Sequence, residues 1–439
     1  MKRRLIRLGV ALLAILVLWL AGGHFAAWLY QRHAMRSWEE RFGPLSATEA
    51  RYPRADDSPA ARELARLAVA LGIDFATGEI TESPLPLAEM ARYVTGRLEG
   101  KPVDRAAAAR VVEALEAQAG AIAELRTHVL GPAEVRWRAD VAAGYEAPIP
   151  PLGSHRWLAN VLAADALLRD GRGDTAGASR DVEALWRLTD ALRSRPELVT
   201  QLVVMVLDMR NLRTLQRVSL ESVETWSDRD RALAAYDARE GLVRALMLEA
   251  WMWHQMADSV SLTWFHWGHA IAATAPEAAD DDPRPPVVRY LVDPVASPFL
   301  RLSMTNTMLV GQQMVENVAA ADPCVAAGGE GLQPEVPGWN TIGQIVVPTL
   351  ARSYQSALRH TLTLELTRKV LEAKEARIAN GSWPASSSAP SSICGGWSWV
   401  TETTDDAFSI ALVGAPIEPG DTPALRFQSE VAPAEDDAG

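Results

Sequence analysis

The longest apolar run of the chain stands near its N-terminus and predicts a membrane-spanning helix. From Leu8 to Tyr30, 23 residues pass without Asp, Glu, Lys or Arg. A helix of that length is about 35 Å long, enough to cross a hydrocarbon core of about 30 Å with some tilt. The remainder of the chain alternates apolar and polar positions as a globular body does.

Basic residues flank this run unevenly, which predicts the direction of the helix. Four precede the run and two follow it: Lys2, Arg3, Arg4 and Arg7 against Arg32 and Arg36. The excess before the run favours an N-terminus in the cytoplasm and a body outside it. The first alternative is a cleaved signal peptide, although no A-x-A pattern directly follows Leu20 and the apolar character resumes through Trp28. A buried core helix is the second alternative.

The body shows the periodicity of helices. Ser58 is the predicted N-cap of one helix, Pro59 its first residue, and Gly72 its end; apolar residues at i, i+3, i+4 and i+7 lie between them. Further helices are expected over the ranges 87–98, 103–130, 198–215, 228–256, 301–320 and 341–378. Pro348 is a candidate kink in the last of them.

One pair of helices resembles a tetratricopeptide hairpin. The segments Trp157–Asp170 and Thr175–Leu192 flank a turn of small residues, and Ala176, Gly177 and Ala178 open the second segment. No second convincing copy occurs at a spacing of 34 residues, and a solenoid needs about three units. The sequence therefore predicts one repeat-like hairpin inside a helical body.

After Pro384, the helical periodicity of the sequence gives way to serine-rich and strand-like segments. The stretch 386–392 is predicted to be a serine-rich loop, the ranges 397–402 and 407–413 a β-hairpin, and 424–431 a third strand. The predicted fold class is mainly α, with an N-terminal transmembrane helix, a helical body containing the tetratricopeptide-like hairpin, and a small C-terminal antiparallel β-element. The predicted parts are an anchor at 1–35, a helical body at 36–270, an acidic, proline-rich linker at 271–289, a second helical segment at 290–384, the β-element at 385–432 and a disordered tail at 433–439.

The net charge and the motifs of the sequence restrict the classes of function that we expect. The net charge is −12, so nucleic acid is not an expected partner, because binding phosphates requires clustered Lys and Arg. Neither the G-x-S-x-G nor the G-x-x-x-x-G-K-[ST] pattern occurs. We therefore predict no catalytic residue, cofactor or metal ligand.

Cys324 and Cys394 are the two cysteines of the chain, and both follow the membrane segment. An oxidising compartment and an even count fit a disulfide between them. Two unpaired thiols are the alternative, because sequence alone does not fix their distance.

Aromatic residues, histidines and carboxylates form the other candidates. Trp264, Phe265 and Trp267 fit either a buried core or an interaction patch. His254, His266 and His269 lie close in sequence but lack the H-E-x-x-H spacing of a zinc helix. Glu249, among apolar neighbours, is a candidate buried and paired carboxylate. Three acids of the last helix have the pattern of a solvated face: Glu365, Glu372 and Glu375.

The exit of the last helix resembles that of pseudopilin-like proteins. There, a long helix ends in a pattern such as Y-x-x-x-N-G-x-Y-P before a small antiparallel sheet. Asn380, Gly381, Trp383 and Pro384 match it, whereas Ala376 replaces the first tyrosine and the N-terminal processing motif is missing. The wider chain resembles uncharacterised bacterial membrane-anchored envelope proteins, through the stretches 135–137, 157–192, 244–249 and 340–384.

That resemblance implies a single-pass protein of the bacterial inner membrane with its body in the periplasm, and it brings no activity with it. We expect a membrane-anchored protein that binds or scaffolds a protein partner. The alternatives are an anchored hydrolase with an active site built from scattered residues, and a secretion- or pilus-associated component.

Overall fold

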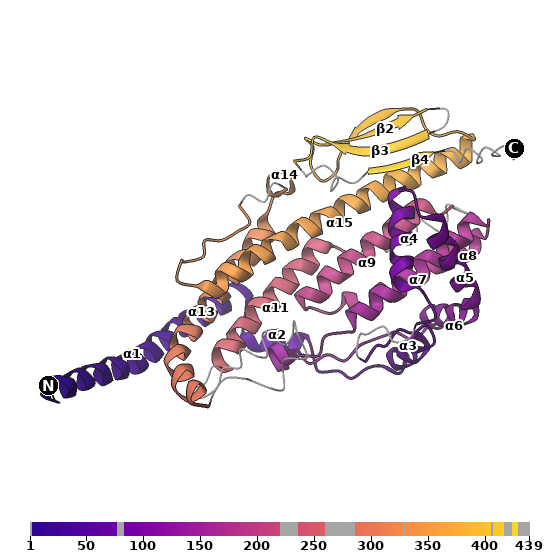
Figure 1. Cartoon of the computed structure of the whole chain (residues 1–439). Coiled ribbons are helices and arrows are strands. Elements are labelled where there is room, and N and C mark those ends of the chain that lie inside the picture. The colour runs from indigo at the N-terminus through magenta and orange to yellow at the C-terminus, as the bar shows by residue number, and fades with distance from the viewer. Residues whose placement is uncertain are drawn as a thin grey trace.

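The helices form an elongated bundle with the apolar N-terminal helix projecting from one end and a small sheet lying at the other (Figure 1). The computed structural model describes residues 2–76, 83–219, 236–259, 286–327, 331–404, 407–416 and 424–428. The elements of the first half are α1 (Lys2–Phe42), α2 (Leu45–Arg51), α3 (Pro59–Val69), α4 (Leu87–Glu99), α5 (Arg105–Ala117), α6 (Ala119–Val129), the 3₁₀ helix η1 (Val141–Glu146), α7 (Leu152–Gly171), α8 (Thr175–Arg193) and α9 (Leu198–Arg217).

The second half supplies three long helices and the sheet. Its elements are α11 (Ala238–Ser259), α13 (Pro286–Ala320), α14 (Pro323–Ala326), α15 (Thr341–Asn380), β1 (Ser387–Pro390), β2 (Ser398–Thr403), β3 (Ala407–Val413) and β4 (Ala424–Gln428). The strands form one antiparallel sheet in the order β1-β2-β3-β4. The predicted fold class is confirmed in its mainly helical body, its long apolar N-terminal helix and its C-terminal antiparallel sheet.

Local sequence signals set several helix ends as predicted. The Ser58 hydroxyl accepts a hydrogen bond from the Ala61 amide at 3.1 Å, so it caps α3. Gly381 follows α15 with φ of +73°, a left-handed conformation that favours glycine and ends the helix. The Asn-Gly pair thus ends the last helix where the sequence pattern places its exit.

Other boundaries differ from the predictions. The helix predicted over 103–130 is two helices, because the backbone leaves helical geometry at Gln118. Strand β1 lies in the stretch predicted to be a serine-rich loop; it pairs with β2, with Ser388 opposite Val400. Helix α13 starts at Pro286, inside the predicted linker. Of the helix predicted over 228–256, the structure describes residues 236–256, and the helix begins at Ala238.

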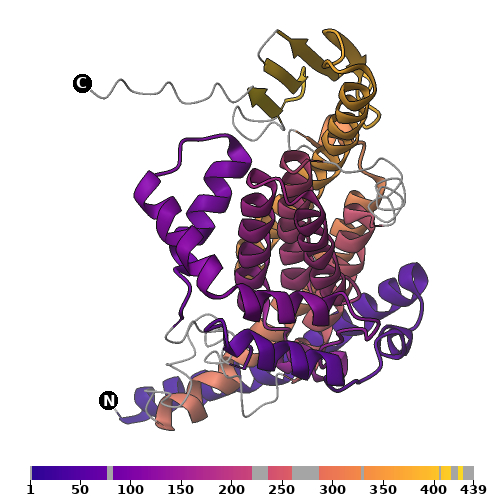
Figure 2. The same ribbon diagram turned by 90° about the vertical axis from the view of Figure 1, so that its right-hand side faces the viewer.

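The core lies between the long helices and continues beneath the sheet. Helix α7 packs against α8, α8 and α15 pack against α9, and α11 packs against α13 (Figures 1 and 2). Buried residues of α15 such as Leu366 and Val370 belong to the same hydrophobic cluster as Trp399, Phe408 and Ile410 of the sheet. Burial of these apolar side chains fixes the sheet on the bundle.

Candidate functional site at the base of the apolar helix

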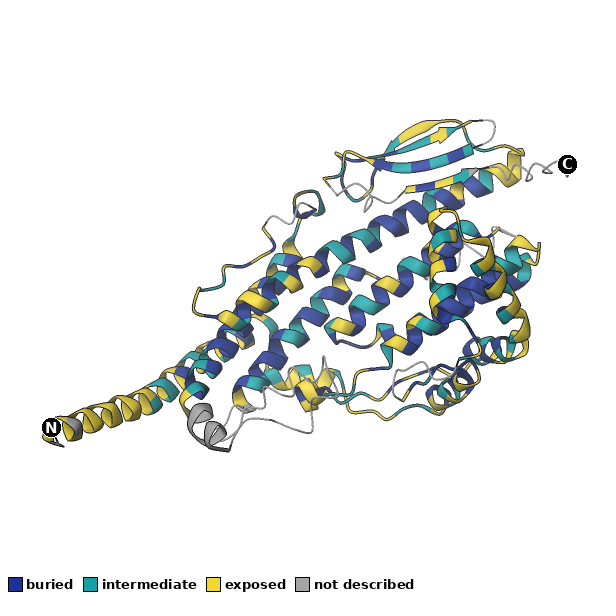
Figure 3. Cartoon of the chain, viewed as in Figure 1, coloured by how far each residue is buried: buried dark blue, intermediate teal, exposed yellow. Residues whose placement is uncertain are grey.

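Helix α1 has two parts that differ in what surrounds them. In the first part, apolar side chains are open to the surroundings: Leu12 is 58% and Leu18 72% exposed. In the second part, Ala34 and Trp38 are fully buried against the body (Figure 3). By length and composition, α1 is the one helix among the described residues that could cross a membrane. Its exposed apolar surface is unusual for a soluble helix and suits lipid.

Hydrogen bonds along α13 hold α1 in place from Trp19, within the apolar run, to Ser37 in its second part. The indole nitrogen of Trp19 donates to the carbonyl of Val295 at 2.8 Å. The Asn306 amide donates to the Tyr30 hydroxyl at 2.8 Å, and the Ser37 hydroxyl donates to Gln312 at 2.9 Å. Together they span nearly twenty residues of α1, so the end of the apolar segment and the body form one packed unit.

A polar cluster lies just below the apolar segment, between α1, α11 and α13; Gln31 and His254 are buried in it, whereas Asp258 is exposed. The Gln31 amide nitrogen donates to the Asp258 carboxylate at 2.7 Å, and its oxygen accepts from Arg301 at 3.0 Å. The His254 ring lies 3.5 Å from the same amide and 3.8 Å from Asp258. Burial lowers the pKa of His254 below its usual value, and Asp258 opposes that shift. Each side chain has a partner here, so the cluster joins helices rather than presenting free groups.

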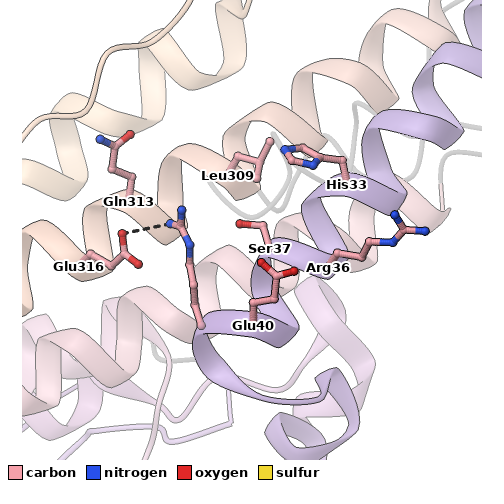
Figure 4. Close-up of a pocket in the computed structure, with 8 residues that line it drawn as sticks. His33, Arg36, Ser37, Glu40, Leu309, Gln313 and Glu316 are labelled. Carbon is pink, nitrogen blue, oxygen red and sulfur yellow. Dashed lines mark hydrogen bonds and ion pairs between the residues drawn. The ribbon is translucent and has the colours of Figure 1, made fainter.

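A hollow of about 620 Å³ opens beside this cluster, between α1 and α13 (Figure 4). Its lining is polar and carries both signs of charge: His33, Arg36, Ser37, Glu40 and Arg41 from α1, and Leu309, Gln313 and Glu316 from α13. Arg41 and Glu316 form an ion pair at 3.0 Å across it. Since the hollow begins within one helical turn of Tyr30, it would face the polar layer of a membrane entered by α1. Its mixed charges suit a polar or zwitterionic group.

The two predicted disulfide candidates are joined. Cys324 and Cys394 form a disulfide with their Cα atoms 5.4 Å apart, although 70 positions separate them in sequence. The bond ties α14, which follows α13, to the turn between β1 and β2. The predicted interaction patch of Trp264, Phe265 and Trp267 lies outside the described residues, as do His266 and His269.

The carboxylates named from the sequence have different environments. Glu249 is half-buried and accepts a hydrogen bond from the Tyr145 hydroxyl at 3.2 Å; burial raises its pKa, and that hydrogen bond opposes the rise. The prediction that Glu365 lies on a solvated face is wrong. Glu365 is buried and accepts from the Ser391 hydroxyl and the Ser392 amide, each at 2.6 Å.

A deeply buried charged cluster that the sequence does not predict lies where α8, α9 and α15 meet. Asp208 of α9 is 1% exposed; Arg193 donates to it at 2.8 Å and the His360 ring lies 3.5 Å from it. No signal in the sequence marks these residues, because their three helices meet only in the folded chain. Neither Asp208 nor His360 lines the hollow beside α1, and a group of three or more metal-ligating side chains is absent from the described part of the chain.

Comparison of the chain with family models, curated proteins and solved structures finds no match.

Proposed function

We propose that this protein is a membrane-anchored binding or scaffolding protein without catalytic activity. The observation that carries the proposal is the two-part character of α1. One continuous helix presents apolar side chains to lipid and then packs against α13 through Trp38 and the Asn306–Tyr30 hydrogen bond. A body packed in this way stays at a fixed height and angle at the membrane surface, as a scaffold requires.

The direction in which α1 crosses the membrane indicates the compartment that contains the body. The basic residues Arg3, Arg4 and Arg7 before the apolar segment favour a cytoplasmic N-terminus, which puts the body in the periplasm of a bacterium. The Cys324–Cys394 disulfide agrees with an oxidising compartment. A reporter enzyme fused after Gly439 is expected to be active only outside the cytoplasm, and activity inside would contradict this orientation.

The anchor is tested by placing charges in it. Leu13 and Val17 are 61% and 55% exposed, and each arginine at the centre of a membrane helix costs about 2.5–3.5 kcal/mol. We expect the L13R/V17R variant to leave the membrane fraction on alkaline extraction, whereas the wild type stays. The matched control V69R/I149R charges two comparably exposed apolar side chains outside α1, at 60% and 55%, and should remain in the membrane.

The binding role is tested with a photo-cross-linking residue in living cells. Gln313 lines the hollow beside α1 and is exposed, whereas Glu372 is exposed on α15. We expect one abundant protein adduct from position 313 and none from position 372. Absence of an adduct at position 313, together with turnover in a broad hydrolase screen, would favour the enzyme alternative over the proposal.

A further inference from the structure

A second hollow, of about 400 Å³, lies at the opposite end of the bundle from the apolar part of α1. It is formed where the C-terminal ends of α9 and α15 meet strand β4. Its lining combines basic and aromatic side chains: Arg217, Ser219, Lys374, Arg377, Ile378, Gly381, Trp383 and Phe427. It shares no residue with the hollow beside α1.

Lys374 is the most buried charge in this hollow, with 8% of its surface exposed. Its ammonium donates to the carbonyl of Val218 at 2.6 Å and lies 3.4 Å from that of Leu215, at the end of α9. These contacts satisfy helix carbonyls, but they use two of the three N–H groups that an ammonium offers. Burial lowers the pKa of Lys374 to about 7, opposed by Asp170 and assisted by Arg217.

Two guanidinium groups complete the basic lining. Arg217 donates to the carbonyls of Leu98 at 3.1 Å and Arg426 at 2.8 Å. The Arg377 guanidinium lies 4.5 Å from the centre of the Trp383 ring. Phe427 connects the basic groups, because the Arg217 guanidinium and the Lys374 ammonium each lie 5.5 Å from its ring centre.

These cations have little negative charge to balance them. No carboxylate lines the hollow, and within the described part of the chain none forms an ion pair with Arg217, Lys374 or Arg377. The carbonyl ends of α4 and α9 each supply about half a negative charge. Asp170 lies near Lys374, but its carboxylate accepts from the Ser219 amide at 2.6 Å. The two guanidinium charges, together with a Lys374 side chain that is partly protonated near pH 7, therefore exceed the compensation beside them.

We propose that this hollow binds the oxyanion group, a phosphate or a carboxylate, of a small ligand. Arg377 is exposed at the rim and would make the first contact, while the free N–H of Lys374 would donate from the floor. Charge-assisted hydrogen bonds of this kind are the strong ones in proteins. The volume exceeds what a single oxyanion fills, so the remainder of the hollow would take the body of the ligand against Phe427 and Trp383.

Titration calorimetry on the full chain in detergent tests the proposal with inorganic phosphate and succinate as separate probes. We expect saturable binding of at least one probe, and the tighter of the two identifies the class of oxyanion. R377Q is expected to weaken binding about tenfold or more, because it removes a positively charged hydrogen-bond donor from the rim of the hollow. R352Q, which neutralises an exposed arginine elsewhere on α15, should bind like the wild type.

The pH dependence separates an anion site from a lysine that only caps α9. Because the pKa of free Lys374 is near 7, an anion should bind more weakly at pH 8.5 than at pH 6.5, and K374M should lose that dependence. Succinate suits this comparison, since its carboxylates stay ionised over most of that range. Binding of neither probe, or equal affinities of R377Q, R352Q and the wild type, would overturn the proposal.

Discussion

The two hollows lie at opposite ends of the bundle and differ in how their charges are balanced. Beside α1, Arg41 is paired with Glu316, and Glu40 lies on the same lining as Arg36. Beside β4, Arg217, Lys374 and Arg377 contact carbonyl oxygens and aromatic rings, and in the described part of the chain none of them forms an ion pair with a carboxylate. The first arrangement can hold two helices together without a ligand, whereas the second has positive charge left over.

The two ends also differ in how they are held. The end beside α1 depends on side-chain packing and hydrogen bonds between α1 and α13, with Trp38 at their centre. The sheet, by contrast, is joined to α14 by a covalent bond, Cys324–Cys394, and its β1–β2 turn is held on α15 by the buried carboxylate of Glu365. The comparison predicts that reduction and acid will affect the sheet end more than the helix α1 end.

The largest effect is expected from loss of the disulfide. The C324S/C394S variant opens a loop closed across 70 residues, which by chain entropy lowers the free energy of unfolding by about 4 kcal/mol. Thermal unfolding of the variant and of the reduced wild type, followed by near-ultraviolet circular dichroism, should show similar losses. Membrane extraction of the variant should be unchanged; release from the membrane would show that the two ends are not independent.

A smaller effect is expected from E365Q. Burial raises the pKa of Glu365, but the hydrogen bonds from Ser391 and Ser392 outweigh it and hold the pKa below its usual value. The ionised form therefore stabilises the fold above the unfolded pKa of about 4.5, and this stabilisation is lost as the pH falls through the folded pKa. We expect E365Q to lower the free energy of unfolding by roughly 1–2 kcal/mol at pH 7.

Urea unfolding at pH 7 and pH 3.5 measures this effect. The difference between E365Q and the wild type should shrink at pH 3.5, because below the unfolded pKa the unfolded carboxyl binds a proton more readily than the folded carboxylate does. E372Q is the matched control, since Glu372 is exposed on the same helix and should change stability little at either pH. An equal loss in both variants would mean that burial of Glu365 is not the cause.

The smallest effect is expected from R41Q at the other end. The Arg41–Glu316 ion pair is about half exposed on both sides, and such pairs contribute 0–1 kcal/mol. Urea unfolding of R41Q should therefore differ from the wild type by less than about 1 kcal/mol, and 0.5 M salt should reduce even that difference. A loss comparable to that of E365Q would show that the hollow beside α1 depends on charge pairing as strongly as the sheet end depends on Glu365.

Much of the fold follows from local sequence. The uncharged run from Leu8 to Tyr30, the cap at Ser58 and the glycine at position 381 act over a few residues each, so their consequences can be read directly. The hairpin of β2 and β3 is likewise marked by its own alternating pattern, with Phe408, Ile410 and Leu412 buried. These signals predict which elements exist and where most of them end.

Only the tertiary structure decided which charged residues are buried in the protein interior. Glu365 and Lys374 stand on α15 among Arg and Glu neighbours that look solvent-exposed in sequence, and strand β1 has a loop-like composition. Glu365 is buried because the β1–β2 turn covers it, and Lys374 because the end of α9 does. Burial depends on which distant segment packs over a residue, and helical periodicity carries no record of that segment. The apolar helix could be read from the sequence, whereas the basic hollow required the fold.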